Sequence, residues 1–315
     1  MSELTLAQVV TQLETLYPLR YAESWDYPGL IIGEPSASVK KIYCAVDPSI
    51  DIAREAVAWG ADLLITHHPL WFRSVHTISG AGHRGYVAQM LIQNHCALWV
   101  GHTNADAAHR GVSHVLADEL GLTHQVPLVP LSDPTSPYPV GEGRVGELKS
   151  AISLYDLAQR VNALIPPTKR GIDVAGDLDM LVRHIAIVGG SGDSLLNEVR
   201  QAHVDVYITS DLRHHPTLDA MQQAQREADL RAQGITVENE IIHDIAANYD
   251  VDIKPALINI PHYAAEKKWF DYAIPDLLQA LKEQYDIVPE ISLSETDTDP
   301  WTLHLDSPQE PHLPR

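Results

Sequence analysis

Two adjacent histidines, His67 and His68, close the apolar stretch ADLLITHHPL. The residues before them read as a buried strand, and neighbouring side chains of a strand point to opposite faces. The strand must therefore end there if both imidazoles are to serve one site. Pro69 favours an extended conformation at His68, and loops at the carboxyl ends of parallel strands form the usual ligand crevice of open α/β sheets. At such an edge the two imidazoles could each bind a different metal ion.

A second group of candidate ligands follows the strand-like segment 97–101. It contains His102, Asn104 and Asp106 in the sequence HTNAD. If this strand is a neighbour of the strand before His67, the two groups lie side by side at the same sheet edge. Asp is also a common N-cap, so capping of the following helix is the alternative role for Asp106.

The third group, His262 and Glu266, follows the apolar segment 256–260. The two residues are four apart, so on a helix they share one face and can converge on one ion. The second imidazole of the HExxH zinc-protease motif is absent. The alternative is a histidine at a helix start and an exposed glutamate that interacts with the helix dipole. Taken together, three strand-end loops with imidazole and carboxylate groups indicate a transition-metal site.

Two further motifs give weaker indications. The second HHP, which begins at His214, follows the strand-like VYITS and the residues Ser210 and Asp211. We expect Asp211, His214 and His215 to line the cavity as proton carriers or phosphate contacts. A turn capped by Asp211 and a helix started by Pro216 is the alternative. The glycine-rich segment 189–192 could cradle a phosphate, although it matches neither common phosphate-loop motif, and a tight turn also explains it.

Alternating strands and helices must position these groups. In the first part of the chain, strands are predicted at 39–46, 62–66 and 97–101, and helices at 6–16, 51–59, 84–94 and 111–120. This alternation predicts an α/β fold whose first sheet is mainly parallel, with helices on both faces. After the Pro-, Ser- and Gly-rich segment 126–145, which reads as a connection, strands are predicted at 184–188 and 204–209, and helices at 154–164 and 194–202. These elements predict a second, smaller α/β domain.

The predicted domain boundaries follow from these patterns. The metal-site domain comprises residues 1–126 and 255–295, and the second domain comprises residues 127–222. Residues 223–254 are charged and alanine-rich, which predicts a helical excursion on the surface. The acidic, proline-containing tail 296–315 is expected to be partly disordered.

Composition excludes several classes of protein. The 42 acidic residues against 22 basic ones give a net charge of −20, which argues against binding to a nucleic-acid backbone. The two cysteines lie in apolar stretches and indicate neither a disulfide framework nor a thiolate zinc site. We see no signal peptide and no apolar run of the roughly 20 residues that cross a bilayer. The sequence therefore predicts a soluble cytoplasmic protein without a membrane partner.

Several motifs resemble, in chain order, those of the NIF-three-like dinuclear metal family, whose members are often labelled GTP cyclohydrolase I type 2 homologues. They are SWDYPGLIIG, DLLITHHPLWF, GHTNADAAHRGVSHVLADELGL, HIAIVGGSG, VDVYITSDLRHH and INIPHYAAEK. The similarity spans residues 4–267, apart from the excursion before Pro255. Ser210 stands where the family usually has glycine.

The resemblance implies two interlinked α/β domains, in which the segment after the second domain returns to the first and completes the metal site. It also implies a homohexameric ring with the metal sites facing an internal cavity. The implied ligands of the two ions are His67, His68, Asp106, His262 and Glu266. Further cavity or substrate candidates are Trp25, Asp26, Asn104, Asp211 and His214, and candidate proton carriers are His102 and His215. For Trp25 and Asp26, an aromatic plug with a turn is an equally good interpretation.

Charge balance indicates the ligand class. Two divalent ions bring four positive charges, and two carboxylates return only two, so a hydroxide or an anionic ligand should join the site. A bridging hydroxide and a phosphorylated small molecule fit this need. Asp106 or Glu266 would bridge the ions, which such sites hold about 3.5–4 Å apart. Imidazole and carboxylate ligands accept Zn, Fe, Mn, Co or Ni.

Two functions are therefore expected as alternatives. The first is a metal-dependent hydrolase of a nucleotide or other phosphorylated small molecule, with a metal-bridging hydroxide as nucleophile. The family label points to opening of the guanine ring of GTP, but nothing in the chain specifies guanine. The second is a non-catalytic metal-binding or metal-delivery assembly that works through protein partners.

Overall fold

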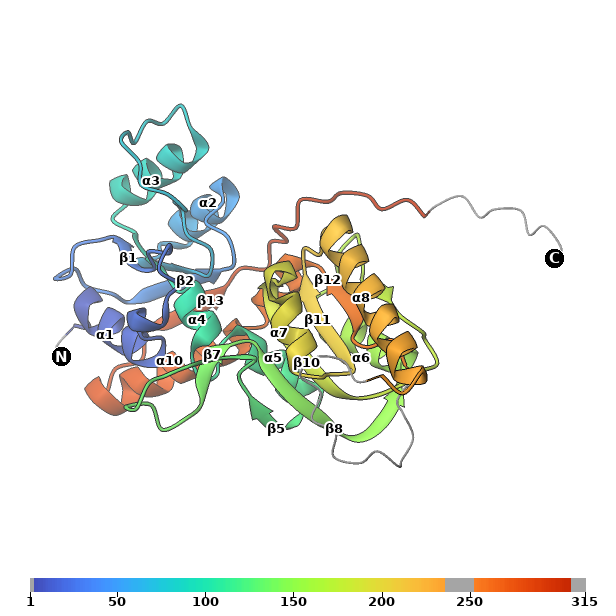
Figure 1. The fold of residues 1–315 in the computed structure, drawn as a ribbon. Coiled ribbons are helices and arrows are strands. Elements are labelled where there is room, and N and C mark those ends of the chain that lie inside the picture. The colour runs from blue at the N-terminus through green and yellow to red at the C-terminus, as the bar shows by residue number, and fades with distance from the viewer. Residues whose placement is uncertain (1–2, 236–251, 307–315) are drawn as a thin grey trace.

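The computed structural model of the chain describes residues 3–235 and 252–306. Two lobes lie side by side, each built on a β-sheet (Figure 1). The amino-terminal lobe carries α1, α2 and α3, and the second lobe carries α6, α7 and α8. The chain is thus an α/β protein, as its alternating pattern predicts.

The sheet of the first lobe is mainly parallel, as expected. Its strand order is β1 (Gly29–Ile32), β4 (Ala97–Val100), β3 (Leu63–Thr66), β2 (Lys41–Ala45) and β13 (Glu290–Leu293). All neighbouring pairs are parallel except β1 and β4. The neighbours β3 and β4 pair in register with Thr66 opposite Val100. The strand ends that carry His67 and His102 therefore lie at the same edge.

Helices cover both faces of this sheet. Because strand side chains alternate, Ile42 and Cys44 of β2 pack in one core and Tyr43 and Ala45 in another. The first core includes α1 (Leu6–Leu16) and α10 (Phe270–Tyr285), and the second includes α2 (Ile50–Trp59) and α3 (His83–Gln93). Strands buried on both faces read as continuous apolar runs, which explains why β2, β3 and β4 are visible in the sequence.

The sheet of the second lobe is mixed. Its strand order is β5 (Thr123–Val126), β8 (Arg144–Ser153), β10 (Leu181–Ser191), β11 (Val206–Ser210), β12 (Ala256–Ile260) and β9 (Asp173–Ala175). The central strands β10, β11 and β12 are parallel. One face packs on α6 (Leu154–Leu164), and the other packs on α7 (Leu196–Gln201) and α8 (His214–Ala232). Helix α6 has the predicted bounds.

The chain returns to the first sheet after β12. Strand β12 pairs with β11 and so belongs to the second sheet, whereas α10 and β13 pack in the first lobe. The predicted boundary at residue 255 placed β12 in the first domain, but its ladder with β11 assigns it to the second sheet. The domain boundaries themselves stay a prediction.

Short strands with glycine or proline occur where loops were expected. Strand β1 lies inside the opening segment, and β6 (Val129–Leu131) and β7 (Val140–Glu142) form a two-stranded sheet inside the segment expected as a connection. Pro130 and Gly141 pair in that small sheet, and both residue types disfavour strands in a sequence-based assignment.

The excursion and the tail are only partly described. Helix α8 accounts for the start of the excursion, and its Ala224 and Ala228 are buried, so this part packs on the lobe. Residues 236–251 of the excursion and 307–315 of the tail lie outside the described residues. Residues 296–306 have no regular secondary structure. No helix of the described ranges is long and apolar enough to cross a bilayer.

Candidate metal centre

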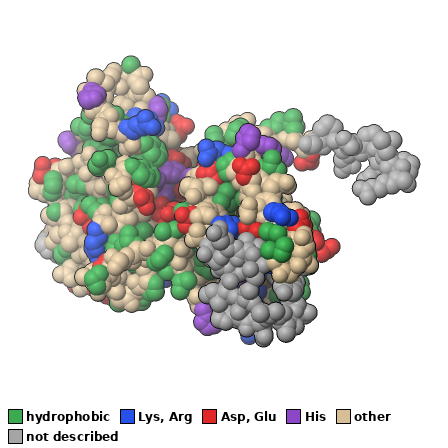
Figure 2. Space-filling view, viewed as in Figure 1, with side chains coloured by type: hydrophobic (Ala, Val, Ile, Leu, Met, Phe, Trp, Pro, Cys, Tyr) green, Lys and Arg blue, Asp and Glu red, His purple; other side chains and the backbone are tan. Residues whose placement is uncertain are grey.

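The carboxyl ends of parallel strands from both sheets meet at one place. Strand β3 is followed by His67, and β4 by His102. From the second sheet, β11 is followed by Asp211, and β12 by Pro261 and then by α9 (His262–Lys267). In Figure 2, histidine and acidic side chains lie together where the two lobes meet. The crevice expected at one sheet edge is thus formed by two sheets.

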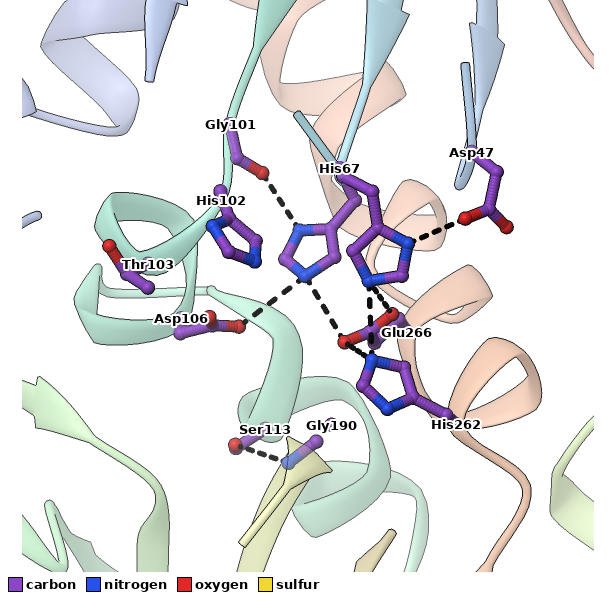
Figure 3. Close-up of polar contacts among 12 residues, drawn as sticks. Asp47, His67, Gly101, His102, Thr103, Asp106, Ser113, Gly190, His262 and Glu266 are labelled. Carbon is purple, nitrogen blue, oxygen red and sulfur yellow. Dashed lines mark hydrogen bonds and ion pairs between the residues drawn. The ribbon is translucent and has the colours of Figure 1, made fainter. Parts of the chain in front are cut away.

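Glu266 lies at the centre of this cluster (Figure 3). Its Oε1 is 2.7 Å from His262 Nε2 and 3.3 Å from His67 Nε2, and its Oε2 is 2.9 Å from His68 Nε2. His262 and Glu266 share one face of α9, as their spacing predicts. His68 Nε2 and His262 Nε2 are 3.2 Å apart. Three imidazoles from two sheets therefore turn their Nε2 atoms toward one carboxylate.

Each of these imidazoles is anchored through its other nitrogen. His67 Nδ1 lies 2.8 Å from the carbonyl oxygen of Gly101. A carbonyl only accepts, so Nδ1 of His67 donates the proton and the neutral ring keeps its lone pair on Nε2. His68 Nδ1 donates to Asp47 at 2.7 Å, and His262 Nδ1 donates to Asp211 at 2.8 Å. Metal-binding histidines typically show this arrangement, because the outer hydrogen bond fixes the ring and frees Nε2.

Three buried polar atoms at the cluster lack a partner with the geometry of a hydrogen bond. They are His67 Nε2, Asp106 Oδ1 and Glu266 Oε2, and the last of these has His68 Nε2 2.9 Å away as a close neighbour. Buried polar atoms are nearly always hydrogen-bonded, and a bound cation is one explanation when they are not. All three atoms can donate an electron pair to a metal, so the donor set fits a transition-metal ion.

The electrostatics of the cluster are dominated by Glu266. Burial lowers the pKa of His67, so its ring is neutral. Burial alone would also lower the pKa values of His68 and His262, but Glu266 and the partners at Nδ1 outweigh it and raise them to about 10 and about 11. Burial would raise the pKa of Glu266, yet the surrounding imidazoles hold it well below its usual value. The cluster therefore contains an ionised carboxylate among groups that bind cations when deprotonated.

Asp106 and His102 extend the cluster. Asp106 lies on α4 (Thr103–Ala107) with Oδ1 3.8 Å from His67 Nε2. Asp106 lies inside this helix, whose N-cap is His102, and the following helix, α5 (Val112–Glu119), begins after Gly111 without a side-chain cap, so the capping alternative is not observed. Burial, and then the charges of Glu266 and Glu142, raise the pKa of Asp106 well above its usual value. The ligand atoms of His67, His68 and His102 lie within 4.8 Å of one another, as do those of His68, His262 and Glu266.

Among the other candidates, some support the cluster. Asp26 accepts hydrogen bonds from His102 Nδ1 at 2.9 Å and from the hydroxyl of Thr103 at 2.6 Å. Burial would raise the pKa of Asp26, but these hydrogen bonds outweigh it and lower the pKa to about 2. Asn104 is fully buried, accepts from the His102 backbone N–H and donates to the carbonyl of Tyr17. Asp26 and Asn104 therefore fix the loop around His102 and do not line a cavity beside the cluster.

The second HHP lies away from the cluster. His214 and His215 start α8 with their rings in edge contact, and neither lines the cavities at the cluster. They belong to neither group of convergent ligand atoms. The expectation that they line the cavity wall is therefore not met, because α8 begins beyond the end of β11. Asp211 does reach the site, with a left-handed φ of 54°, a conformation that is uncommon for a residue other than glycine.

Gly190 approaches the cluster closely. It has a φ of 86°, and a Cβ added to it would lie 2.7 Å from Glu266 Oε1. The backbone N–H groups of Gly189 and Gly192 already donate, to Ser113 and to the Ser210 carbonyl. Gly190 therefore serves close packing against Glu266, and the amides of Gly189 and Gly192 are occupied within the protein.

Two cavities open onto His68 and His262. The larger has a volume of about 550 Å³ and is also lined by Trp25, Asp106 and Glu142. The smaller has a volume of about 440 Å³ and is lined on its outer side by the tail residues Thr298 to Trp301. A ligand can therefore reach the cluster from either side.

Asp47 and Glu142 lie at the site without a ligand-like spacing in the sequence. Asp47 follows β2 and orients His68, and the Thr298 hydroxyl of the tail donates to its second oxygen at 2.5 Å. Glu142 lies in the segment expected as a connection. The position of Asp47 at a strand's carboxyl end, next to the strand of His67, is the signal that could have found it.

The chain has relatives of similar length. A profile of the family Duf34/NIF3 (NGG1p interacting factor 3) matches residues 4–300. A Streptomyces coelicolor protein named GTP cyclohydrolase 1 type 2 homolog is 40% identical over 303 residues, covering 96% of this chain and 95% of that protein. A Mycobacterium bovis protein with the same name is 26% identical, covering 95% of this chain and 97% of that protein.

Solved structures share the fold. A Bacillus cereus protein related to NIF3 superposes with a TM-score of 0.79 at 20% identity, covering 96% of this chain and all of that one (100%). A Staphylococcus aureus hypothetical protein superposes with a TM-score of 0.76 at 24% identity, covering 96% and 100%. At these identities the likeness concerns the fold alone.

Proposed function

Because the chain belongs to the Duf34/NIF3 family, we propose that its central cluster binds two divalent transition-metal ions and hydrolyses a small phosphorylated molecule. The proposed ligands are His67, His68, Asp106, His262 and Glu266. The observation that carries the proposal is the set of anchored imidazoles, whose Nε2 atoms converge on Glu266 beside buried atoms that lack a partner with the geometry of a hydrogen bond.

Glu266 and His102 have different proposed roles at the site. Glu266 contacts imidazoles from both sheets, so it would hold the metal ions together with them. The ions would supply Lewis acidity and a water of lowered pKa. His102 lies beside His67 and His68, with its Nδ1 held by Asp26, so its Nε2 is the candidate for moving a proton at the site.

The ligand class follows from charge. The positive charge of two divalent ions exceeds the negative charge of the two carboxylates among the proposed ligands. An anionic group such as a phosphate is therefore attracted to the cluster. The name of the curated relatives suggests a nucleotide such as GTP. The described lining of the larger cavity does not single out guanine, and the proposed substrate class is a phosphorylated small molecule.

A second function is supported by the two-sided access to the cluster. A site that opens to two cavities can exchange its ions, which suits a metal-binding or metal-delivery protein without turnover. Metal transfer to a chelator, without hydrolysis of any substrate, would favour this alternative.

The test combines metal content with turnover. The protein is purified, loaded separately with Zn, Mn, Fe, Co or Ni, and analysed for bound metal. We expect about two ions per chain in the wild type, as in two-metal hydrolytic sites. The His67→Ala and Glu266→Gln variants should lose metal, while His124→Ala, on an exposed strand end, should retain it. Absence of metal in the wild type, or unchanged metal content in both cluster variants, would refute both functions.

Turnover then separates the two functions. The loaded protein is screened against nucleotides and phosphoesters, with Asp106→Ala as the reference. Hydrolysis above that reference supports the hydrolase. Bound metal with no turnover above Asp106→Ala across the panel supports metal binding or delivery instead.

Assembly and location form part of the proposal. We propose a cytoplasmic homohexameric ring with the cluster facing an internal cavity. Exposed apolar side chains near the site, among them Trp25, Tyr27 and Phe72, support contacts between subunits. Light scattering of the purified chain measures the assembly, and a monomeric mass would contradict it.

A further inference from the structure

Glu142 lines the larger cavity with an unused carboxylate. It ends β7, and its half-buried side chain has no hydrogen bond or ion pair with any of the described residues. The same cavity is lined by His68, His262 and Glu266. Glu142 therefore shares a wall with the proposed metal ligands without belonging to them.

Among the described residues, only the imidazoles of the cluster could offer this carboxylate a positive charge within the cavity. Among its described lining residues there is no lysine or arginine. Arg84 lies over the ring of Phe72, with its Cζ 5.9 Å from the ring centroid, and does not line the cavity. Burial raises the pKa of Glu142, and the carboxylates of Glu23 and Glu198 raise it further. A half-buried carboxylate without a partner pays a desolvation cost, and a ligand that supplies a hydrogen-bond donor offsets that cost and so binds more tightly.

The proposed function leaves Glu142 free for the ligand. Metal ions at the cluster would compensate Asp106 and Glu266, and an anionic group of the ligand would face those ions. The apolar part of the cavity wall comes from β6 at Val129 and Leu131, and from Trp25. A matching ligand has an anionic group facing the ions, an apolar or aromatic part against the apolar wall, and a hydrogen-bond donor facing Glu142.

We propose that Glu142 is a specificity-determining residue that accepts hydrogen bonds from a positively charged or N–H-bearing group, such as an ammonium, an amidinium or an amino-heterocycle. This inference rests on the proposed metal site. It narrows the ligand from any phosphorylated small molecule to one that also carries a donor group.

The test uses three phenylphosphonates, whose P–C bond resists hydrolysis. They carry a para aminomethyl, methyl or carboxyl group, and their binding to the metal-loaded full-length protein is measured by calorimetry. We expect the aminomethyl compound to bind about tenfold more tightly than the methyl compound, the size of effect expected for a hydrogen bond to a charged group. The carboxyl compound should bind more weakly than both.

Variants locate the preference at one side chain. The charge of Glu142 acts on Asp106, so the variants are compared at saturating metal. Glu142→Gln should then remove most of the tenfold preference while the methyl compound still binds, and Glu142→Lys should favour the carboxyl compound. Glu198→Gln is the matched control, because it removes a nearby charge without removing a lining group, and it should retain the preference.

The outcomes separate this inference from the proposed function. Binding of all three compounds without a preference, or an equal preference in Glu142→Gln, overturns the role of Glu142 and leaves the metal site standing. Failure of all three compounds to bind the metal-loaded protein counts against both the anionic ligand and the role of Glu142.

Discussion

At the scale of single residues, the outer hydrogen bonds decide what the imidazoles can do. His68 and His262 are held through Nδ1 by Asp47 and Asp211, which makes each Nε2 available to the cluster. If these imidazoles bind metal as proposed, the carboxylates behind them help to determine how tightly the metal is held.

We predict that Asp47→Asn weakens metal binding without unfolding the protein. The amide keeps the shape of the side chain but removes the negative charge behind His68. Loss of such a partner typically lowers metal affinity by about 10- to 100-fold, and we expect about tenfold here. Competition with a metal-binding dye measures the change. Asp51→Asn, on the exposed face of α2, should bind metal like the wild type, and equal affinities of all three proteins would contradict the prediction.

The sequence allowed the convergent histidines to be predicted better than their partners. His67 and His68 interrupt an apolar run, and His262 and Glu266 have helical spacing, so their residue types and positions carry a signal. Asp47 and Glu142 are ordinary acidic residues in sequence, and only the pairing of strands brings them to the site. A carboxylate is recognisable as a partner only once its neighbour in space is known.

At the scale of secondary structure, the carboxyl ends of the strands position the side chains of the cluster. Strands buried on both faces and amphipathic helices could be predicted because their apolar patterns are clear, as for β3, α1 and α6. Short strands such as β1, β7 and β9 could not, because three or four residues at a sheet edge show no period. The assignment of β12 to the second sheet follows from its ladder with β11, which no local pattern indicates.

The end of β10 offers a test at this scale. Gly190→Ala should displace Glu266, because the new methyl group would lie 2.7 Å from Glu266 Oε1, and we expect loss of bound metal. Gly60→Ala is the matched control: it has a similar φ of 79° and no atom within 4 Å of the added Cβ. Both variants should lose about 1–2 kcal/mol of stability to the left-handed backbone, but only Gly190→Ala should lose metal. Elemental analysis together with urea unfolding distinguishes the two effects, and full metal content in Gly190→Ala would show that Glu266 tolerates the methyl group.

At the scale of the whole molecule, a buried arginine joins the lobes. Arg144 of β8 donates to the carbonyl of Ala108, next to α4, and its Nε donates to the ring of His114 on α5 (Val112–Glu119). The ring accepts this hydrogen bond only when it is neutral. Burial, followed by the charge of Arg144, lowers the pKa of His114 to about 2.

This junction predicts a pH-dependent stability. The unfolded chain binds a proton at His114 below pH 6.5, whereas the folded chain does not, so acidification favours unfolding. Between pH 7.5 and 5.5 the free energy of unfolding should fall by about 1.4 kcal/mol through this group. Urea unfolding in the presence of a chelator should show this fall reduced in His114→Gln, which keeps a hydrogen-bond acceptor. An identical pH dependence in the two proteins would show that His114 is not the responsible group.

The meeting of two sheets at one cluster also sets an order of events during synthesis. His68 and His262 are 194 residues apart in sequence yet 3.2 Å apart at Nε2. While the ribosome is still making β12, the emerging chain contains His67 and His68 but neither His262 nor Glu266, so a metal ion finds an incomplete set of ligands. If the cluster binds metal as proposed, tight loading therefore waits until both sheets have folded and docked, and bound metal would mark a chain synthesised beyond Glu266.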